Sequence, residues 1–295
     1  MKRIKIGFLV NNDNIDNYNY QLLKWLLKNN DKFIVSSFIS IKNTKKKIIL
    51  KKIPKKIFFK FIILFEYFVL LLIKKHNNHF KKLDLKKIIK KKISIEKNNF
   101  NKKIFNEKDI AKIKNEKYDV IIRACTDILS GDILKLSTFG IISFHHGDNK
   151  KFRGSPAGFW EVFFRSPSTG FVIQKIDKNI DAGNIIERGF FATKSFFLLN
   201  QAELYNKSLF YFKNVLLKIH KNRKLKFFDK SKLGKVYETP KIFNQLIYFA
   251  KIIKVLFKKK FSKKKYFKLA LFDKMNLKKP IIIENTINKN FLADP

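Results

Sequence analysis

Short runs of hydrophobic residues recur along the chain and predict the strands of a sheet. Residues 3–10 (RIKIGFLV), 33–39, 119–124 (DVIIRA) and 140–144 (GIISF) have the length of strands, and a further strand is predicted at 170–176. Strands that are hydrophobic at almost every position are typical of parallel sheets, which are covered on both faces. The pattern therefore predicts an α/β fold with a mostly parallel, Rossmann-like sheet, in which 119–124 and 140–144 are adjacent central strands.

Amphipathic segments between and after these runs predict helices. Residues 20–28 place four leucines on one stripe, as a helix that covers a sheet does. Further helices are predicted at 132–136, 203–219 and 239–257, the last opening with Thr239 and Pro240 as N-cap and first-turn residue, and a turn followed by a helix is predicted within 155–165.

Composition divides the chain into two predicted domains. Residues 1–200 hold the predicted strands and form the catalytic domain, whereas residues 201–295 are predicted to be a helical, lysine-rich extension. The extension lacks the series of five short strands that an OB-type barrel requires. Within residues 43–117, lysine runs surround a single apolar segment.

That apolar segment, residues 57–73 (IFFKFIILFEYFVLLLI), includes Lys60 and Glu66. A membrane-spanning helix needs about 20 apolar residues, and charged residues inside it are costly. We therefore expect a core or interfacial helix rather than a span. The lysines on both sides of the segment would let such a helix lie on an anionic membrane surface.

The formal net charge of +42 raises the question of an anionic partner. Clustered basic residues bind nucleic acids and anionic membranes. Here only six of the 65 basic residues are arginine, and lysine, asparagine, isoleucine and phenylalanine dominate, as an AT-rich coding sequence favours. A solvated basic surface and a specific tRNA-binding surface are therefore both open.

The cysteine content and the N-terminus indicate a cytoplasmic protein. Cys125 is the only cysteine, which excludes an intramolecular disulfide and suits a reducing compartment. Met1 to Val10 has the pattern of a strand rather than of a signal peptide.

Glycine and arginine concentrate in one part of the chain. Eight of the ten glycines lie between Gly131 and Gly189, and four of the six arginines lie between Arg123 and Arg188. Glycine allows unusual backbone conformations and close approaches, and arginine recognises anions in a planar, bidentate way. We therefore expect the functional site within residues 119–190.

The candidate motif begins where the strand 140–144 ends. Residues 143–154 read SFHHGDNKKFRG, and Asp181-Ala-Gly183 follows a predicted helix and strand. This order resembles the folate-dependent formyltransferases, in which a strand ends in Asn-x-His and is followed by Tyr-Arg-Gly and Asp-x-Gly. With Phe152-Arg153-Gly154 placed on Tyr-Arg-Gly, His145 lies on the family histidine without a gap.

The resemblance implies an enzyme that transfers a formyl group from 10-formyltetrahydrofolate to an amine. It implies that His145 and Asp181 are catalytic, with Ser143 at the position of the family asparagine, whose amide helps to hold the formyl oxygen. The loop 146–150 also departs from the family. The resemblance further assigns the folate to Ile128, Leu129, Gly147, Asp148 and Asp177, and the acceptor to Arg153 and Gly154.

This chemistry explains the residue types. The reaction passes through a tetrahedral species with a developing oxyanion, and the attacking amine must lose a proton. An imidazole can relay that proton near neutral pH, and a carboxylate beside it orients the ring. No metal site is predicted, because His145 and His146 are adjacent strand residues that point to opposite faces.

The acceptor expected from the motif is an amino sugar or a sugar nucleotide. Two alternatives remain open: methionyl-tRNA formyl transfer, which the basic charge favours, and a catalytically degenerate formyltransferase fold that binds a membrane surface or a partner protein.

Overall fold

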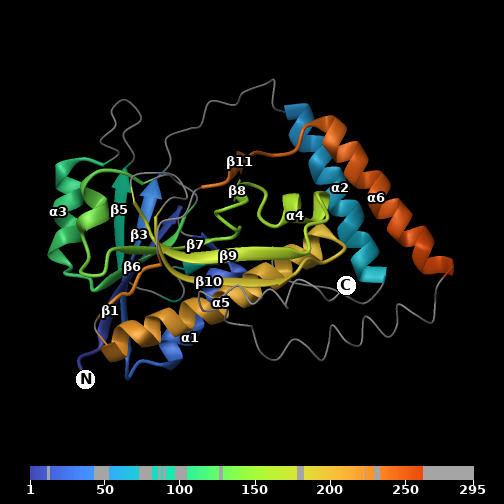
Figure 1. Cartoon of the computed structure of the whole chain (residues 1–295). Coiled ribbons are helices and arrows are strands. Elements are labelled where there is room, and N and C mark those ends of the chain that lie inside the picture. Colours follow the sequence, from blue (N-terminus) through green and yellow to red (C-terminus); the bar gives the residue numbers. More distant parts are fainter. Residues whose placement is uncertain are drawn as a thin grey trace.

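The computed structural model describes residues 1–11, 14–42, 53–72, 82–85, 88, 91–96, 105–125, 129–177, 183–222, 224–228 and 233–261 (Figure 1). The strands are β1 (Ile4–Asn11), β2 (Asn14–Asp16), β3 (Phe33–Lys42), β4 (Lys82–Asp84), β5 (Lys92–Glu96), β6 (Val120–Ala124), β7 (Ile141–His145), β8 (Phe152–Gly154), β9 (Ser168–Lys175), β10 (Asn184–Ala192) and β11 (Lys235–Tyr237). The helices are α1 (Asn17–Lys28), α2 (Ile53–Leu72), α3 (Glu107–Asn115), the 3₁₀ helix η3 (Asp132–Lys135), α4 (Phe159–Phe163), α5 (Phe197–Asn222) and α6 (Ile242–Phe261).

A nine-stranded sheet forms the centre of the molecule. The strands β5, β3, β1, β6 and β7 are neighbours in that order and run parallel, whereas β9 and β10 continue the sheet antiparallel. The predicted mostly parallel α/β fold is confirmed, and β6 and β7 are adjacent central strands. The short strands β2 and β4 extend the sheet from the end of β1.

Two hydrophobic layers cover the sheet. On one face, the leucines of α1 and the apolar side of α5 pack against residues such as Phe8, Ile122 and Phe144. On the other face, Ile113 of α3 and Ile133 of η3 pack against Leu9 and its neighbours. Successive strand residues therefore alternate between the two layers, which fixes the face to which each side chain points.

The turn and helix predicted within 155–165 are present, but the helix, α4 (Phe159–Phe163), ends before Arg165. Gly158 precedes it with a φ of 78°, and Arg165 follows with a φ of 54°. These left-handed conformations end a right-handed helix on both sides. The start expected at Thr239 and Pro240 is also wrong, because α6 begins at Ile242.

The helix α5 crosses the domain boundary that the sequence predicts at residue 200. It begins at Phe197, and its buried residues, among them Leu204, Tyr211 and Phe212, belong to the hydrophobic cluster of the sheet. The first part of the predicted extension is thus a cover of the sheet.

The predicted apolar helix is α2, and it lies beside α6 at one end of the molecule (Figure 1). Phe65 and Phe249 pack at a ring distance of 5.1 Å. The buried Glu66 carboxylate accepts hydrogen bonds from the Leu198 backbone N–H at 2.8 Å and from the Tyr248 hydroxyl at 2.9 Å. It thereby ties α2 and α6 to the first turn of α5. Among the described residues, no helix is both long enough and apolar enough to cross a membrane.

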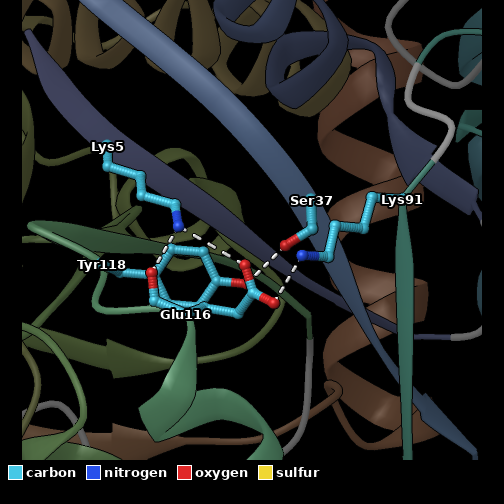
Figure 2. A network of polar contacts seen from close by, with 5 residues as sticks. All are labelled: Lys5, Ser37, Lys91, Glu116 and Tyr118. Atoms are coloured by element: carbon cyan, nitrogen blue, oxygen red, sulfur yellow. Dashed lines mark hydrogen bonds and ion pairs between the residues drawn. The ribbon is translucent and has the colours of Figure 1, made fainter.

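A polar network holds together the edge of the sheet where β1 and β6 begin (Figure 2). The Glu116 carboxylate lies 2.6 Å from the Lys91 ammonium and 3.5 Å from that of Lys5. Ser37 and the buried Tyr118 form a hydrogen bond beside them. Because Lys5 of β1, Ser37 of β3 and Glu116, which follows α3, all contribute, the network fixes the amino-terminal edge, opposite to the edge where the predicted site lies.

Candidate active site

The two histidines at the end of β7 point to opposite faces of the sheet. His146 follows Phe144 on the α5 side, where it packs against Tyr18 and Tyr205, and its Nε2 atom lies 3.1 Å from the Ser208 hydroxyl. Burial lowers the pKa of His146 to about 3, with a smaller contribution from His145. His146 is therefore neutral and partly buried among aromatic side chains on the α5 side, and His145 faces the other side.

Three polar side chains form a row across that other side. Arg123 of β6 is in register with Ser143 of β7, and Ser143 is in register with Gln174 of β9. Residues in register on adjacent strands share a face and lie about 5 Å apart. The Arg123 guanidinium is 3.4 Å from the Ser143 hydroxyl, which itself donates to the Phe144 carbonyl at 2.9 Å. The row places a cation, a hydroxyl and an amide beside one another.

A second row runs through His145. This residue is in register with Val172 of β9, and Val172 with Arg188 of β10. The Arg188 guanidinium donates to the Asn149 side chain at 2.9 Å, and burial lowers the pKa of Arg188 while Asp148 raises it. An arginine thus lies at the far end of the row that begins with the predicted catalytic histidine.

The loop after β7 folds back over this face. Gly147 is required there, because a Cβ atom would lie 2.4 Å from the Phe152 carbonyl oxygen and 3.2 Å from the His145 Nε2 atom. Asp148 accepts a hydrogen bond from the Lys150 backbone N–H at 3.1 Å. Its Cβ atom comes within 2.9 Å of the position that a side chain on Gly170 would occupy. The predicted folate residues Gly147 and Asp148 therefore lie beside His145 and over β9.

The predicted acceptor residues lie on a separate small sheet. Arg153 and Gly154 belong to β8, which pairs in parallel with β11. The Arg153 guanidinium donates to the Gly234 carbonyl at 3.3 Å. A Cβ atom on Gly154, which has a φ of 91°, would lie 2.1 Å from the Tyr237 carbonyl oxygen. Both residues thus hold β8 against β11.

A buried carboxyl group lies on α4, near this loop. Glu161 is almost inaccessible, and its Oε1 atom has no hydrogen-bond partner. Burial raises the pKa of Glu161 to about 7, and the charge of Asp148 adds to the increase. The α4 aromatic residues Phe159 and Trp160 are core residues.

Of the remaining predicted site residues, the structure describes Leu129 and Asp177 only. Asp181 and Ile128 lie outside the described residues. The Leu129 side chain is buried in the hydrophobic cluster that includes Leu9 and the buried Cys125. Asp177 is partly buried and follows the end of β9. Their roles in binding and catalysis stay predictions.

Sequence reasoning missed Gln174, Arg188, Asn149 and Glu161. A signal was present for the first two, since each is a polar residue within a strand that is otherwise mostly apolar. Their proximity to His145 depends on strand register, which the sequence does not display. Within the described part of the chain, no three His, Cys, Asp or Glu side chains come together as metal ligands.

No protein-family model and no curated protein matches the sequence. Solved structures do match. A sugar N-formyltransferase from a Shewanella species has a TM-score of 0.50 and 14% identity, over 79% of this chain and 76% of its own. Phosphoribosylglycinamide formyltransferase from Anaplasma phagocytophilum has a TM-score of 0.51 and 13% identity, over 80% of this chain and 100% of its own.

A formyltetrahydrofolate deformylase from Pseudomonas syringae also matches, with a TM-score of 0.51 and 13% identity, over 79% of this chain and 66% of its own. These three enzymes have different reactions in their names and share one architecture. The chain therefore has the fold of the folate-dependent formyltransferases.

Proposed function

We propose that the protein transfers a formyl group from 10-formyltetrahydrofolate to an amine, and that the amine belongs to an amino sugar or a sugar nucleotide. The observation that carries this proposal is the position of His145. It lies at the carboxyl end of a central strand, on the face that also bears Ser143, Gln174 and Arg123. Open α/β sheets bind ligands outside the carboxyl ends of their strands.

The proposed reaction needs a proton relay and hydrogen-bond donors for an oxyanion. The amine nitrogen attacks the formyl carbon with its lone pair, a C–N bond forms, and the carbonyl π electrons move to the oxygen. The carbonyl then re-forms, the bond to N10 of the folate breaks, and that nitrogen leaves with the electron pair and takes up a proton. His145 would relay the proton that the amine loses, and Asp181 would orient the ring. Donors near Ser143 would stabilise the oxyanion.

The charge of the molecule supports an anionic acceptor. Arg123 and Arg188 lie on the face of His145, and the chain has a formal net charge of +42. A positive surface raises the local concentration of anionic substrates, and a sugar nucleotide carries phosphates. We assign the folate to the side of Leu129, Gly147, Asp148 and Asp177.

The test is an acceptor panel with 10-formyltetrahydrofolate as formyl donor. The panel holds nucleotide-linked amino sugars, glycinamide ribonucleotide, methionyl-tRNA and water alone. The proposal predicts an N-formyl sugar product that forms in equal amount to tetrahydrofolate. Formylation of methionyl-tRNA alone would support the alternative acceptor, and consumption of the formyl donor without any acceptor would indicate a deformylase. The absence of both turnover and binding of a folate analogue would refute the proposal.

We further propose that the protein is cytoplasmic and that α2 contacts an anionic membrane surface. Ile57, Phe61, Leu64, Phe68 and Leu71 form one stripe and are 40–66% exposed. The only carboxylate of α2 is the buried Glu66, and α6 has none, whereas both helices carry lysines. Hydrophobic contact and attraction to anionic lipids would act together on such a surface.

Vesicle flotation tests the membrane proposal. The protein should float with vesicles that contain phosphatidylglycerol and stay in solution with pure phosphatidylcholine. Phe61→Ser should weaken the association, whereas Phe210→Ser, at a 45% exposed phenylalanine of α5, should not. Equal behaviour of these two variants would contradict a role for α2.

A further inference from the structure

We propose that the side-chain amide of Gln174 donates a hydrogen bond to the formyl oxygen during transfer. The inference rests on the proposed function and adds a catalytic residue to it. Three observations carry the inference: the register of Gln174 with Ser143, the unpaired buried end of its side chain, and the commitment of the Ser143 hydroxyl to another acceptor.

The register fixes where the Gln174 side chain starts. Gln174 on β9 is directly opposite Ser143 on β7, and His145 lies farther along β7 on the same face. The intervening Phe144 points to the opposite layer. A glutamine side chain is long enough to reach across one strand spacing of about 5 Å. The Gln174 amide can therefore reach a group that is bound at His145.

The end of the Gln174 side chain is buried, and one of its polar atoms has no hydrogen-bond partner. The residue is 4% exposed, and its Oε1 atom has no hydrogen-bond partner. Buried polar atoms nearly always have a partner in native proteins, so an unpaired one calls for an explanation. The oxygen and nitrogen of a side-chain amide can exchange places by rotation. A ligand oxygen beside Gln174 would therefore meet an N–H donor.

Ser143 does not supply this donor in the structure. Its hydroxyl donates to the Phe144 carbonyl at 2.9 Å, and a hydroxyl has only one proton to donate. The nearby Arg123 guanidinium, 3.4 Å from the same hydroxyl, points at Ser143 itself. Among the described side chains of this row, Gln174 is thus the neutral donor that remains.

The end of β9 and the start of β10 lie beside the same amide. Lys175 of β9 and Asn184 of β10 are in register, so Gly183, which precedes Asn184, lies next to the end of β9. A Cβ atom on Gly183 would lie 3.3 Å from the Gln174 Oε1 atom and 2.2 Å from the Lys175 carbonyl oxygen. The absence of a side chain at Gly183 keeps the end of the amide free of a clash.

In the reaction, the amide would act on one atom. The amine attacks the formyl carbon, and the carbonyl π electrons move to the formyl oxygen, where the Gln174 N–H stabilises the negative charge. When the C–N10 bond breaks, the electron pair leaves with the folate nitrogen, and the carbonyl re-forms. Gln174 exchanges no proton and therefore acts without changing its own protonation state.

Kinetics test this role. Gln174→Met keeps the length of the side chain and removes the amide. We expect kcat to fall roughly 100-fold while KM for 10-formyltetrahydrofolate and the melting temperature change little, because removal of one oxyanion donor has an effect of this size. Ser143→Asn in the Gln174→Met background should restore part of kcat, since it brings an amide to the same oxygen from the opposite strand. A wild-type kcat in Gln174→Met would overturn the inference. A melting temperature that is lowered in Gln174→Met and that Ser143→Asn does not restore would also overturn it.

A spectroscopic measurement separates this inference from the proposed function. The infrared stretch of the formyl carbonyl in bound, ¹³C-labelled 5-formyltetrahydrofolate should shift to lower frequency on wild-type protein and less on Gln174→Met. Binding without a difference between the two proteins would refute the role of Gln174 alone. Failure of the wild-type protein to bind the folate would refute both.

Discussion

His145 and His146 are neighbours in the chain with opposite surroundings. His146 is enclosed by Tyr18, Phe144 and Tyr205 and bonded to Ser208, whereas His145 faces Val172 of β9 beneath Gly147. His145 shares its face with Ser143 and Gln174, whereas His146 packs on the opposite, α5 side. The pair therefore provides its own control for the catalytic role of His145.

We expect His146→Phe to keep formyl transfer within a few-fold and His145→Ala to lose it. Burial lowers the pKa of His146 from 6.5 to about 3, so the unfolded chain takes up a proton that the folded protein excludes. Wild-type stability should thus fall as the pH drops from about 6.5 towards 3. His146→Phe should be less sensitive to acid and should lose about 1 kcal/mol at pH 7 with the Ser208 bond.

Urea unfolding of both variants at pH 7 and pH 4.5, with rates measured at pH 7, checks this prediction. An inactive His146→Phe protein that is fully folded would contradict it.

The sequence motif identified part of this site and missed the rest for a physical reason. Ser143 and His145 lie on one strand, so their alternation alone places them on one face. Gln174 and Arg188 reach the same face only through the antiparallel pairing of β9 and β10. That register depends on long-range packing, which local pattern does not encode.

At the scale of elements, a single carboxylate connects three helices. Glu66 of α2 accepts hydrogen bonds from Tyr248 of α6 and from Leu198 in the first turn of α5. The Phe197 backbone N–H donates to the Tyr248 hydroxyl at 2.8 Å. The start of α5 thus has partners for two of its free N–H groups, and both partners come from the α2–α6 pair.

We expect Glu66→Gln to stabilise the protein increasingly as the pH rises. Burial raises the pKa of Glu66 from 4.5 to about 7, so the folded protein prefers the neutral form. The contribution of Glu66 to the stability of the wild-type protein should be fully present below pH 4.5 and should be lost as the pH rises through about 7. Glutamine cannot ionise and keeps a carbonyl acceptor for Leu198. The difference should reach up to about 3 kcal/mol above pH 7.

Denaturant unfolding between pH 4 and pH 8 measures the difference. Tyr248→Phe is the comparison variant, because it removes the hydroxyl that bonds to the Glu66 Oε2 atom and to the Phe197 N–H. It should destabilise the protein at every pH by about 1–3 kcal/mol. A constant difference between Glu66→Gln and wild type across this range would contradict the prediction.

The network in Figure 2 gives a prediction of opposite sign. A hydrogen bond from Lys91, followed by the charges of Lys91 and Lys5, lowers the pKa of Glu116. Its contribution to stability should be present above the unfolded pKa of about 4.5 and be lost as the pH falls through the lowered value. Glu116→Gln should therefore cost about 1 kcal/mol at pH 7 and less in acid, because both lysines are partly exposed.

Glu96→Gln is the matched control for this prediction. Glu96 pairs with Lys42 at 3.9 Å, with both side chains mostly exposed, and its replacement should have no measurable effect. Equal effects of the two substitutions in urea unfolding at pH 7 would contradict the stabilising role of the network around Glu116.

Element existence was more predictable than element ends. Buried strands such as β6 and β7 are apolar at almost every position, so their type and adjacency follow from the sequence. The extent of α4 was not predictable, because it depends on left-handed backbone at Gly158 and Arg165. The predicted domain boundary lies inside α5 for a similar reason. The sequence shows that this helix has an apolar face, but not that this face packs on the sheet.

At the scale of the whole molecule, the sheet separates stability from chemistry. The amino-terminal edge of β1 and β6 carries the ion pairs around Glu116 (Figure 2). The carboxyl end of β7 carries His145. The antiparallel strands β9 and β10 extend the second region with Gln174 and Arg188. This separation allows site residues to be replaced with little expected effect on folding.

The most direct test of the proposed function is formyl transfer by the wild-type protein and by His145→Ala under identical conditions. The reaction contains 10-formyltetrahydrofolate and the panel of nucleotide-linked amino sugars, and both tetrahydrofolate and the N-formyl product are quantified. We expect equal amounts of the two products with wild-type protein, and neither product with a folded His145→Ala variant. Equal product formation by both proteins, or none by wild-type protein that also fails to bind a folate analogue, would contradict it.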